Sequence, residues 1–375
     1  MKKIIPILLI ITIMFSGTAA FAEIETTGKA AYLIEESTGK VLYEKNPDEK
    51  LPIASVTKIM TMLLIMEEID SGKLSMADSV TVSEYAMSMG GSTMFLETGE
   101  VLTVSDMLKG IAVASANDGC VAMAEHISGS TELFVKRMNE RAKELGMENT
   151  NFVNTNGLDA DGHYSSAKDV AIMARELSKH EKIFDYTSIW TDSLRDGKFE
   201  LANTNKLVRF YKGANGLKTG STDLAGCCLC ATATRDGMGL ISVVLGAPTS
   251  KDRFSDATKM LDYGFANFRV IRPVSKEEVL CETEVIKGME DKIELVAGCD
   301  FSEVLNKNDV GEIETKLQIP DSIKAPIEKG EVLGKAEFWS GDKKLGEIPV
   351  VSQNEVKKKS FFMILSEILK NIVGV

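Results

Sequence analysis

The segment SVTKIMTMLLIMEEI, residues 55–69, determines how the rest of this chain is interpreted. Pro52 precedes it, Gly72 follows it, and apolar side chains occupy nearly every side of its helical projection. A helix that is apolar on all sides lies buried in a protein core. Ser55 and Lys58 are three residues apart at its beginning, and residues with that spacing share one face of a helix. The segment therefore predicts a central buried helix that begins with a serine–lysine pair.

This pair can perform nucleophilic chemistry. A serine hydroxyl is a weak nucleophile until a neighbouring base takes its proton, and burial lowers the pKa of a lysine enough to make its amine such a base. Ser55 also lies at the predicted helix N-terminus, where free N–H groups favour the negative charge of acyl transfer. The same S-x-x-K spacing occurs at 37–40 and 165–168, but neither opens an apolar helix. The alternative for Ser55 and Lys58 is a helix N-cap and a lysine whose ammonium reaches solvent.

Two further short motifs support a catalytic role for the Ser55–Lys58 pair. Ser115-Ala116-Asn117 lies at a break between two predicted helices, although S-x-N occurs again at 352–354. Lys218-Thr219-Gly220 occurs once, on a predicted strand. Strand alternation puts Lys218 and Gly220 on one face, a cation beside a residue without a side chain. We expect this arrangement to leave room for a substrate backbone to add to the strand.

The remaining patterns predict an α+β fold. Residues 30–44 and 215–246 predict antiparallel strands, the latter joined by a turn at Asp236-Gly237. We expect an antiparallel sheet with helices on both faces, and an active site between the Lys218 strand edge and the helical part. Further helices are expected near 103–113, 118–128, 131–145, 166–178 and 252–268. Residues 23–272 would form this domain, and short alternating stretches over 273–351 predict a small all-β domain.

Both ends of the chain predict an exported protein at a membrane surface. Residues 1–22 contain two lysines, an apolar run and an A-x-A sequence, which are features of a signal peptide. An uncleaved N-terminal anchor is the alternative. In residues 352–375, three lysines precede a segment, 361–373, whose apolar side chains fall on one half of a helix. Because this helix is too short to span a bilayer, we expect it to lie in the membrane plane, or alternatively to dock on protein.

Composition excludes several other classes. The 375 residues contain 43 Lys and Arg against 55 Asp and Glu, a net charge of −12, and no basic stripe, which argues against a nucleic-acid partner. No metal site is expected, because the three histidines lack zinc-ligand spacing and the D-x-D-x-H string at 159–163 has no fourth ligand nearby. Cys227, Cys228 and Cys230 fall in an apolar strand and are interpreted as buried thiols. Pairing of Cys281 with Cys299 stays open.

The order S-x-x-K, S-x-N, K-T-G is that of penicillin-binding proteins and serine β-lactamases. The chain resembles the D-alanyl-D-alanine carboxypeptidase family of low-molecular-weight penicillin-binding proteins over nearly its whole length. The similarity includes residues 38–46, Asn156-Gly157-Leu158, Gly216–Gly220, the signal peptide, the small β domain and the amphipathic tail. It implies a β-lactamase/transpeptidase-like fold, removal of the terminal D-alanine from peptidoglycan pentapeptides, and acylation by β-lactam antibiotics. It also implies a peripheral enzyme of cell-wall biogenesis and cell shape, on the outer face of the cytoplasmic membrane, that needs no cofactor.

The resemblance assigns catalytic roles to the motif residues. Ser55 would be the acylated nucleophile and Lys58 its base. Ser115 would pass a proton to the leaving D-alanine. The backbone N–H groups of Ser55 and Ser221 would form the oxyanion hole.

The same resemblance assigns the substrate-binding residues. Asn117 would hold the peptide, while Lys218 and Thr219, with Gly220 beside them, would orient the substrate. Arg253 falls where the family has a basic residue near the terminal carboxylate, and a surface salt bridge is its alternative. The family often has glycine where this chain has Ala116, a difference that could shape substrate preference.

Other functions use related residues. An endopeptidase or a transpeptidase would use the same site with a different acyl acceptor. A β-lactamase needs fast attack of water on the acyl-enzyme, and no segment resembles the loop that supplies the class A glutamate. A catalytically silent cell-wall binding protein is disfavoured because all three motifs are intact.

Overall fold

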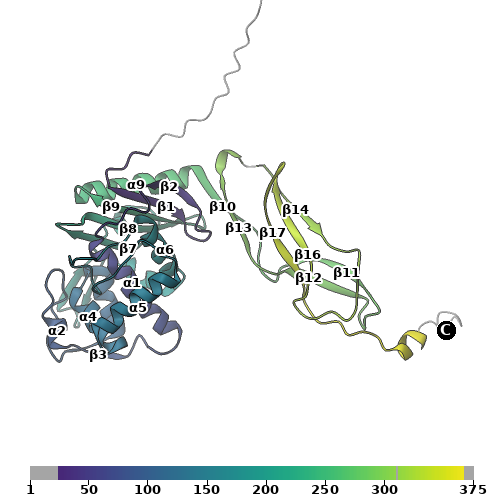
Figure 1. The fold of residues 1–375 in the computed structure, drawn as a ribbon, viewed down its shortest axis with the longest axis horizontal. Coiled ribbons are helices and arrows are strands. Elements are labelled where there is room, and N and C mark those ends of the chain that lie inside the picture. Colours follow the sequence, from purple (N-terminus) through teal and green to yellow (C-terminus); the bar gives the residue numbers. More distant parts are fainter. Residues whose placement is uncertain (1–23, 310, 367–375) are drawn as a thin grey trace, which may run out of the picture.

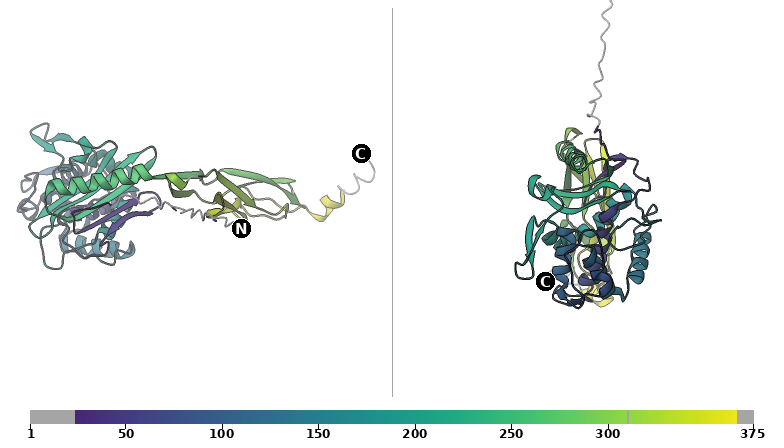
Figure 2. Two further views of the ribbon diagram at one scale, coloured as in Figure 1. Left: turned by 90° about the horizontal axis from the view of Figure 1, so that it is seen from above. Right: turned by 90° about the vertical axis from the view of Figure 1, so that its left-hand side faces the viewer.

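The computed structural model describes residues 24–309 and 311–366. An N-terminal α+β domain leads into a narrower β domain, and the two lie end to end in an elongated molecule (Figures 1 and 2). The predicted signal peptide and the last nine residues of the predicted tail lie outside the described residues.

The N-terminal domain contains one antiparallel five-stranded sheet in the order β2-β1-β9-β8-β7. The strands are β1 (Ala30–Glu35), β2 (Val41–Lys45), β7 (Ala214–Thr222), β8 (Gly226–Arg235) and β9 (Met238–Ala247). Asp236 and Gly237 join β8 to β9 with φ values of 50° and 76°, the left-handed conformation that a tight hairpin turn needs. The lysine motif lies on β7, which is an edge strand.

Helices cover both faces of this sheet, so the predicted fold class is confirmed. One face packs against α9 (Ser250–Asn267), and the other against α6 (Ala167–Ser178), which also contacts α1 (Lys58–Asp70). Residues 58–66 of α1 are all buried, as its uninterrupted apolar pattern predicts. The remaining helical segments are η1 (Ala54–Thr57), α2 (Glu84–Met87), α3 (Val104–Lys109), η2 (Gly110–Ala114), α4 (Asn117–Ser128), α5 (Thr131–Glu144), η3 (Glu181–Ile183), α7 (Phe184–Thr187) and α8 (Leu207–Phe210).

Two small hairpins in this domain have no counterpart in the predicted elements. They pair β3 (Ser79–Thr81) with β4 (Val101–Thr103), and β5 (Thr191–Leu194) with β6 (Phe199–Ala202). Each strand has only three or four residues, too few to show a period of two in the sequence. Strand β6 contacts η2, directly before the S-x-N motif.

The C-terminal domain is all-β, as expected. A six-stranded sheet has the order β14-β16-β17-β12-β11-β15, and β10 pairs with β13. Phe301 stacks on Phe338 in its core, with ring centroids 4.3 Å apart. Its strands are β10 (Phe268–Val274), β11 (Val279–Ile286), β12 (Lys292–Ala297), β13 (Phe301–Asn306), β14 (Ile313–Gln318), β15 (Ser322–Lys324), β16 (Val332–Ser340) and β17 (Lys343–Ser352), with the one-turn η4 (Lys307–Asp309) after β13.

Contacts join the two domains along β13. The Lys40 ammonium donates to Glu303 Oε1 at 2.6 Å and to the Val304 carbonyl at 2.8 Å. The Val304 side chain packs with Leu33 and Leu240 in the core between the large sheet and α9. Strand β13 therefore contributes to the cores of both units.

The chain after β17 continues along the β domain before it becomes helical. The chain bends at 353–354, Val356 then pairs with Ile327 and Lys358 with Gly288, and a helix begins at 361. Phe361 and Phe362 at its start are 72% and 80% exposed. In the part of the chain that the structure describes, no helix is both long enough and apolar enough to cross a bilayer.

Candidate active site

The turn before α1 holds Ser55 in a constrained position. Ala54 has a φ of 46°, a conformation that costs a residue with a side chain about 1–3 kcal/mol and occurs preferentially at functional sites. Two glycines pack against this turn. A Cβ on Gly157 would lie 1.9 Å from the Ala54 carbonyl oxygen, and one on Gly220 would lie 2.9 Å from the Ser55 nitrogen.

Gly220 therefore has a role that differs from the one expected. The sequence suggested that its missing side chain makes room for a substrate backbone. In the structure, the backbone of Ile53 and Ser55 occupies that space. Glycine is needed at this position because strand β7 packs directly on the turn that carries the serine.

Lys58 is completely buried and directed at Ser55. Its Nζ lies 2.8 Å from Ser55 Oγ, 2.7 Å from Asn117 Oδ1 and 2.6 Å from the Asn156 carbonyl oxygen. Burial lowers the pKa of this lysine to about 8, although Cys120 and Asp118 oppose the change. At pH 7 about a tenth of the Lys58 side chains are thus neutral amines, far more than for an ordinary lysine, with the nitrogen beside a hydroxyl.

The S-x-N motif is held by a break in a helix. One turn of π-helix, η2, ends at Ser115, which has a φ of 64° and is 4% exposed. Helix α4 then begins at Asn117, whose Nδ2 donates to the Gly90 carbonyl at 2.7 Å. The structure thus places the Asn117 side chain against the Lys58 amine. Single-turn π-helices occur frequently at functional sites.

Asp118 is a supporting residue that the sequence did not indicate. Its carboxylate accepts hydrogen bonds from the backbone N–H groups of Met94 and Leu96. It thereby fixes the loop that faces the beginning of α4. An aspartate at the second position of a helix is ordinary, so only the folded structure identifies these partners.

Lys218 and Thr219 lie on the edge strand beside this centre. Lys218 is 1% exposed, and burial together with the nearby Lys58 charge holds its pKa well below the ordinary value. Thr219 Oγ1 donates to Thr204 Oγ1 at 2.7 Å, and the Thr204 N–H donates to the Val113 carbonyl in η2. Thr204 therefore links the K-T-G strand to the S-x-N motif.

Ser221 and Arg253 complete the set of predicted residues. Ser221 Oγ donates to the Gly226 carbonyl at 3.1 Å. Arg253 is 8% exposed and donates to the Gly220 and Cys228 carbonyls at 2.8 and 3.3 Å. Among the described residues it has no carboxylate partner, so it is not the surface salt bridge considered above. Its buried Nε has no hydrogen-bond partner.

Asn156 is a site residue that enters through its backbone. Its carbonyl accepts from Lys58, and the loop containing it is closed by Asn154, whose Oδ1 accepts from the Asn156 and Gly157 N–H groups. The sequence singled out Asn156-Gly157-Leu158 only through the family resemblance. A carbonyl gives no signal in a side-chain pattern, so its contact with Lys58 was not predictable.

His163 is buried and hydrogen-bonded beside the turn that carries Ser55. Its Nδ1 accepts from the Val153 N–H at 3.1 Å, so Nε2 carries the proton and donates to Thr57 Oγ1 at 2.8 Å. Burial lowers the pKa of this histidine to about 4. Within residues 24–309 and 311–366 no cluster of three or more acidic, histidine or cysteine side chains could hold a metal ion. All six cysteines are free, including Cys281 and Cys299.

Comparison with known proteins adds independent information. Residues 17–249 match the family model of the S11 peptidases, described as D-alanyl-D-alanine carboxypeptidase, and residues 268–358 match the C-terminal domain of penicillin-binding protein 5. The D-alanyl-D-alanine carboxypeptidase DacF of Bacillus subtilis is 46% identical, over 97% of each chain. DacC of Escherichia coli is 34% identical over 86% of this chain and 82% of its own.

Solved structures agree over both domains. Penicillin-binding protein 5 of Haemophilus influenzae superposes with a TM-score of 0.78 at 32% identity, over 89% of this chain and 98% of the other. Penicillin-binding protein D2 of Listeria monocytogenes, solved in an ampicillin-bound form, has a TM-score of 0.60 at 34% identity. That match covers 65% of this chain and all of the other.

Proposed function

The chain belongs to the S11 family of D-alanyl-D-alanine carboxypeptidases, and from that premise we propose that Ser55 is its nucleophile and Lys58 the base that activates it. The enzyme is a hydrolase that removes the terminal D-alanine from peptidoglycan pentapeptides. The roles of individual residues follow from the geometry of the three motifs.

The contacts of Lys58 are the observation that supports this assignment best. A neutral amine has two N–H donors and one lone pair. Asn117 Oδ1 and the Asn156 carbonyl can each take one N–H, and both are acceptors. The lone pair then faces Ser55 Oγ, 2.8 Å away, which is the distance for a general base to take the hydroxyl proton.

Acylation proceeds by two bond changes. Lys58 takes the proton of Ser55 as Oγ bonds to the carbonyl carbon of the penultimate D-alanine, giving a tetrahedral oxyanion. The C–N bond then breaks, and free D-alanine leaves with a proton passed through Ser115. Water next attacks the ester carbon, Ser55 recovers its hydroxyl proton, and the shortened peptide is released as a carboxylate.

The edge strand binds the substrate in this proposal. Backbone N–H groups of Ser55 and Ser221 stabilise the oxyanion, each contributing about 3 kcal/mol to the transition state. Lys218, Thr219 and Arg253 provide a positive, hydrogen-bonding edge for the terminal carboxylate. No added cofactor is required, because lysine performs the proton transfer. A β-lactam antibiotic would acylate Ser55 by the same first step.

We further propose that the enzyme is exported and held at the membrane surface by its tail. The leader sequence supports export. Exposed Phe361, Phe362 and Leu365 on the described start of the tail helix support insertion into the interface. Their apolar surface has no protein cover in this structure, which favours a lipid surface over docking on the enzyme itself.

The activity test uses the mature protein and a muropeptide that ends in D-Ala-D-Ala. We expect D-alanine release, its absence in Ser55→Ala, and a penicillin adduct by intact mass in the parent protein only. As a matched control, Ser37→Ala removes the serine of a second S-x-x-K sequence and should retain activity. Release by Ser55→Ala would refute the proposed nucleophile.

A further inference from the structure

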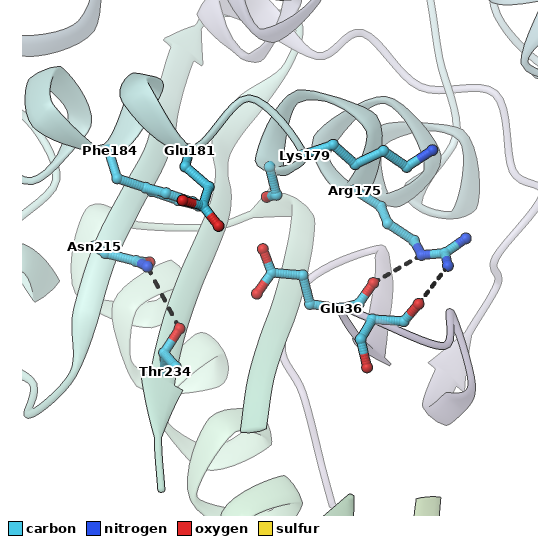
Figure 3. A pocket seen from close by; sticks show the side chains of 9 residues that line it. Glu36, Arg175, Lys179, Glu181, Phe184, Asn215 and Thr234 are labelled. Atoms are coloured by element: carbon cyan, nitrogen blue, oxygen red, sulfur yellow. Dashed lines mark hydrogen bonds between the residues drawn. The ribbon is translucent and has the colours of Figure 1, made fainter. Parts of the chain in front are cut away.

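A second cavity lies away from the nucleophile, at the opposite end of strand β7. Its volume is about 500 Å³, within the range of small-ligand sites. The β1–β2 turn, the end of α6, the η3–α7 segment and the beginning of β7 form its walls (Figure 3). None of the three catalytic motifs lines it.

The Glu36 carboxylate lines this cavity and forms no ion pair among the described residues. It points into the cavity, away from Arg175 (Figure 3). The Arg175 guanidinium instead donates to the carbonyls of Glu36 and Ser37, at 2.8 and 2.7 Å. The Lys179 ammonium is paired with Glu176 at 2.5 Å. Both neighbouring cations thus make their hydrogen bonds with other groups. Burial raises the pKa of Glu36, although the Ser178 hydroxyl and the Arg175 charge oppose the rise.

A buried serine hydroxyl lines the same cavity. Ser178 is 7% exposed, and its Oγ lies near the Glu36 carboxylate, whose pKa it lowers, without a hydrogen bond of ordinary length to any described residue. A buried polar atom without a partner costs about 1–3 kcal/mol, a cost that a ligand donor would remove. On the wall that faces Glu36, Glu181 adds a second carboxylate and Phe184 an aromatic ring (Figure 3).

We propose that this cavity binds a primary ammonium group carried on an alkyl chain. The ammonium has three donors, which match the Glu36 carboxylate, the Ser178 hydroxyl and the Asn215 side-chain oxygen or Glu181. The Phe184 ring provides an apolar surface for the methylene chain. A metal ion fits less well, because the described residues offer no cluster of three ligating side chains here.

A peptide of the cell wall is one source of such an amine. Asn215 lies three residues before Lys218 on β7, about 10 Å away along the strand. A diamino-acid side chain on a bound or neighbouring stem peptide would present the required group. This choice of source rests on the proposed function, whereas the amine site itself does not. Free polyamines are the other source.

The test measures binding of Nα-acetyl-L-lysine amide to the mature, ¹⁵N-labelled protein by NMR titration. We expect saturable shifts with a dissociation constant on the order of 1 mM, and none with the Nε-acetylated probe, which has lost its charge. Glu36→Gln keeps the shape and removes the charge, and should weaken binding about tenfold or more. Ser178→Ala removes a hydroxyl that makes no hydrogen bond of ordinary length, so it should fold normally and also weaken binding. Glu148→Gln, at an exposed carboxylate elsewhere, is the matched control.

The possible results distinguish a failure of the amine site from a failure of the proposed carboxypeptidase function. Equal binding of both probes, no binding, or unchanged binding in both Glu36→Gln and Ser178→Ala would overturn the amine site. Penicillin acylation should stay unchanged in both variants, because neither residue contacts the catalytic motifs. If the parent protein released no D-alanine, the proposed function would be wrong, and the amine site would be unaffected. Parallel titrations of the Ser55→Ala protein with 1,5-diaminopentane and with a lysine-containing pentapeptide would identify the source. Only binding that Glu36→Gln weakens supports the amine site, because the pentapeptide also binds at the catalytic centre in the proposed function.

Discussion

At the scale of single residues, the pKa of Lys58 should govern the pH dependence of the enzyme. In the proposed mechanism the neutral amine is the base, and burial lowers its pKa to about 8. Below pH 8, the second-order rate of penicillin acylation should therefore fall about tenfold per pH unit, and above it the rate should level off. Stopped-flow acylation between pH 6 and 9 measures this. Lys58→Arg, which stays charged, should lower the rate by about 10³-fold. A rate independent of pH over this range would contradict the assignment.

His163 makes a separate prediction, for stability. It is held neutral between Thr57 and the Val153 N–H, and its pKa of about 4 lies below the ordinary value of 6.5. The neutral histidine therefore contributes its full share to the free energy of unfolding above pH 6.5. This share, about 3 kcal/mol in total, is lost as the pH falls through 4. Denaturant unfolding of the parent and His163→Gln across pH 4–7 tests this. His126→Gln, at an exposed histidine on α4, is the control and should follow the parent. If the stability of His163→Gln depended on pH as strongly as that of the parent, His163 could not be the source of the pH dependence.

At the scale of elements, the contact between β7 and the Ser55 turn couples sheet geometry to the nucleophile. A Cβ at Gly220 would lie 2.7 Å from the Ile53 carbonyl oxygen, so one of the two backbones must move. We expect Gly220→Ala to cost about 1–3 kcal/mol of stability and to slow acylation about 100-fold through misplaced reacting atoms. Thermal unfolding and penicillin acylation measure the two effects. Gly311→Ala, where the nearest atom is the Ser340 hydroxyl at 3.3 Å, should change neither. Normal acylation by Gly220→Ala would show that the turn tolerates displacement.

The elements also show what could be predicted from the sequence. The buried helix, the hairpins of the large sheet and the all-β domain have long, regular patterns, and these predictions are confirmed. The break at Ser115 was predicted, but its cause, the π-helical turn η2, was not, because packing against β6 and α7 stabilises it. The supporting contacts of Asn156 and Thr204 use backbone groups and distant loops, which leave no pattern in the chain. The motifs indicated the proposed reacting groups, whereas the contacts that hold these groups in position appear only in the folded structure.

At the scale of the whole molecule, removal of the tail should separate location from catalysis. The shortened protein must keep the residues up to Ser360, because Val356 is buried against the β domain and Lys358 pairs with Gly288. A protein ending at residue 360 should lose binding to vesicles containing anionic lipid while D-alanine release from soluble muropeptide stays unchanged. Vesicle co-sedimentation and the release assay measure these. In the full-length chain, the double substitution Phe361→Ser and Phe362→Ser should also weaken binding to these vesicles. Undiminished sedimentation of the shortened protein would place the membrane contact elsewhere.

The β domain lies between the catalytic domain and the tail along the length of the molecule (Figure 2), and Lys40 and Val304 brace its junction with the catalytic domain. If the tail holds the enzyme at the lipid as proposed, the β domain, as a spacer, would set the height at which the enzyme works. Wall material at that height would be trimmed, while strands nearer or farther would keep their terminal D-alanine. The spacer would then act as a ruler, and a chain with a longer or shorter one would shift the layer of the wall in which pentapeptides are depleted.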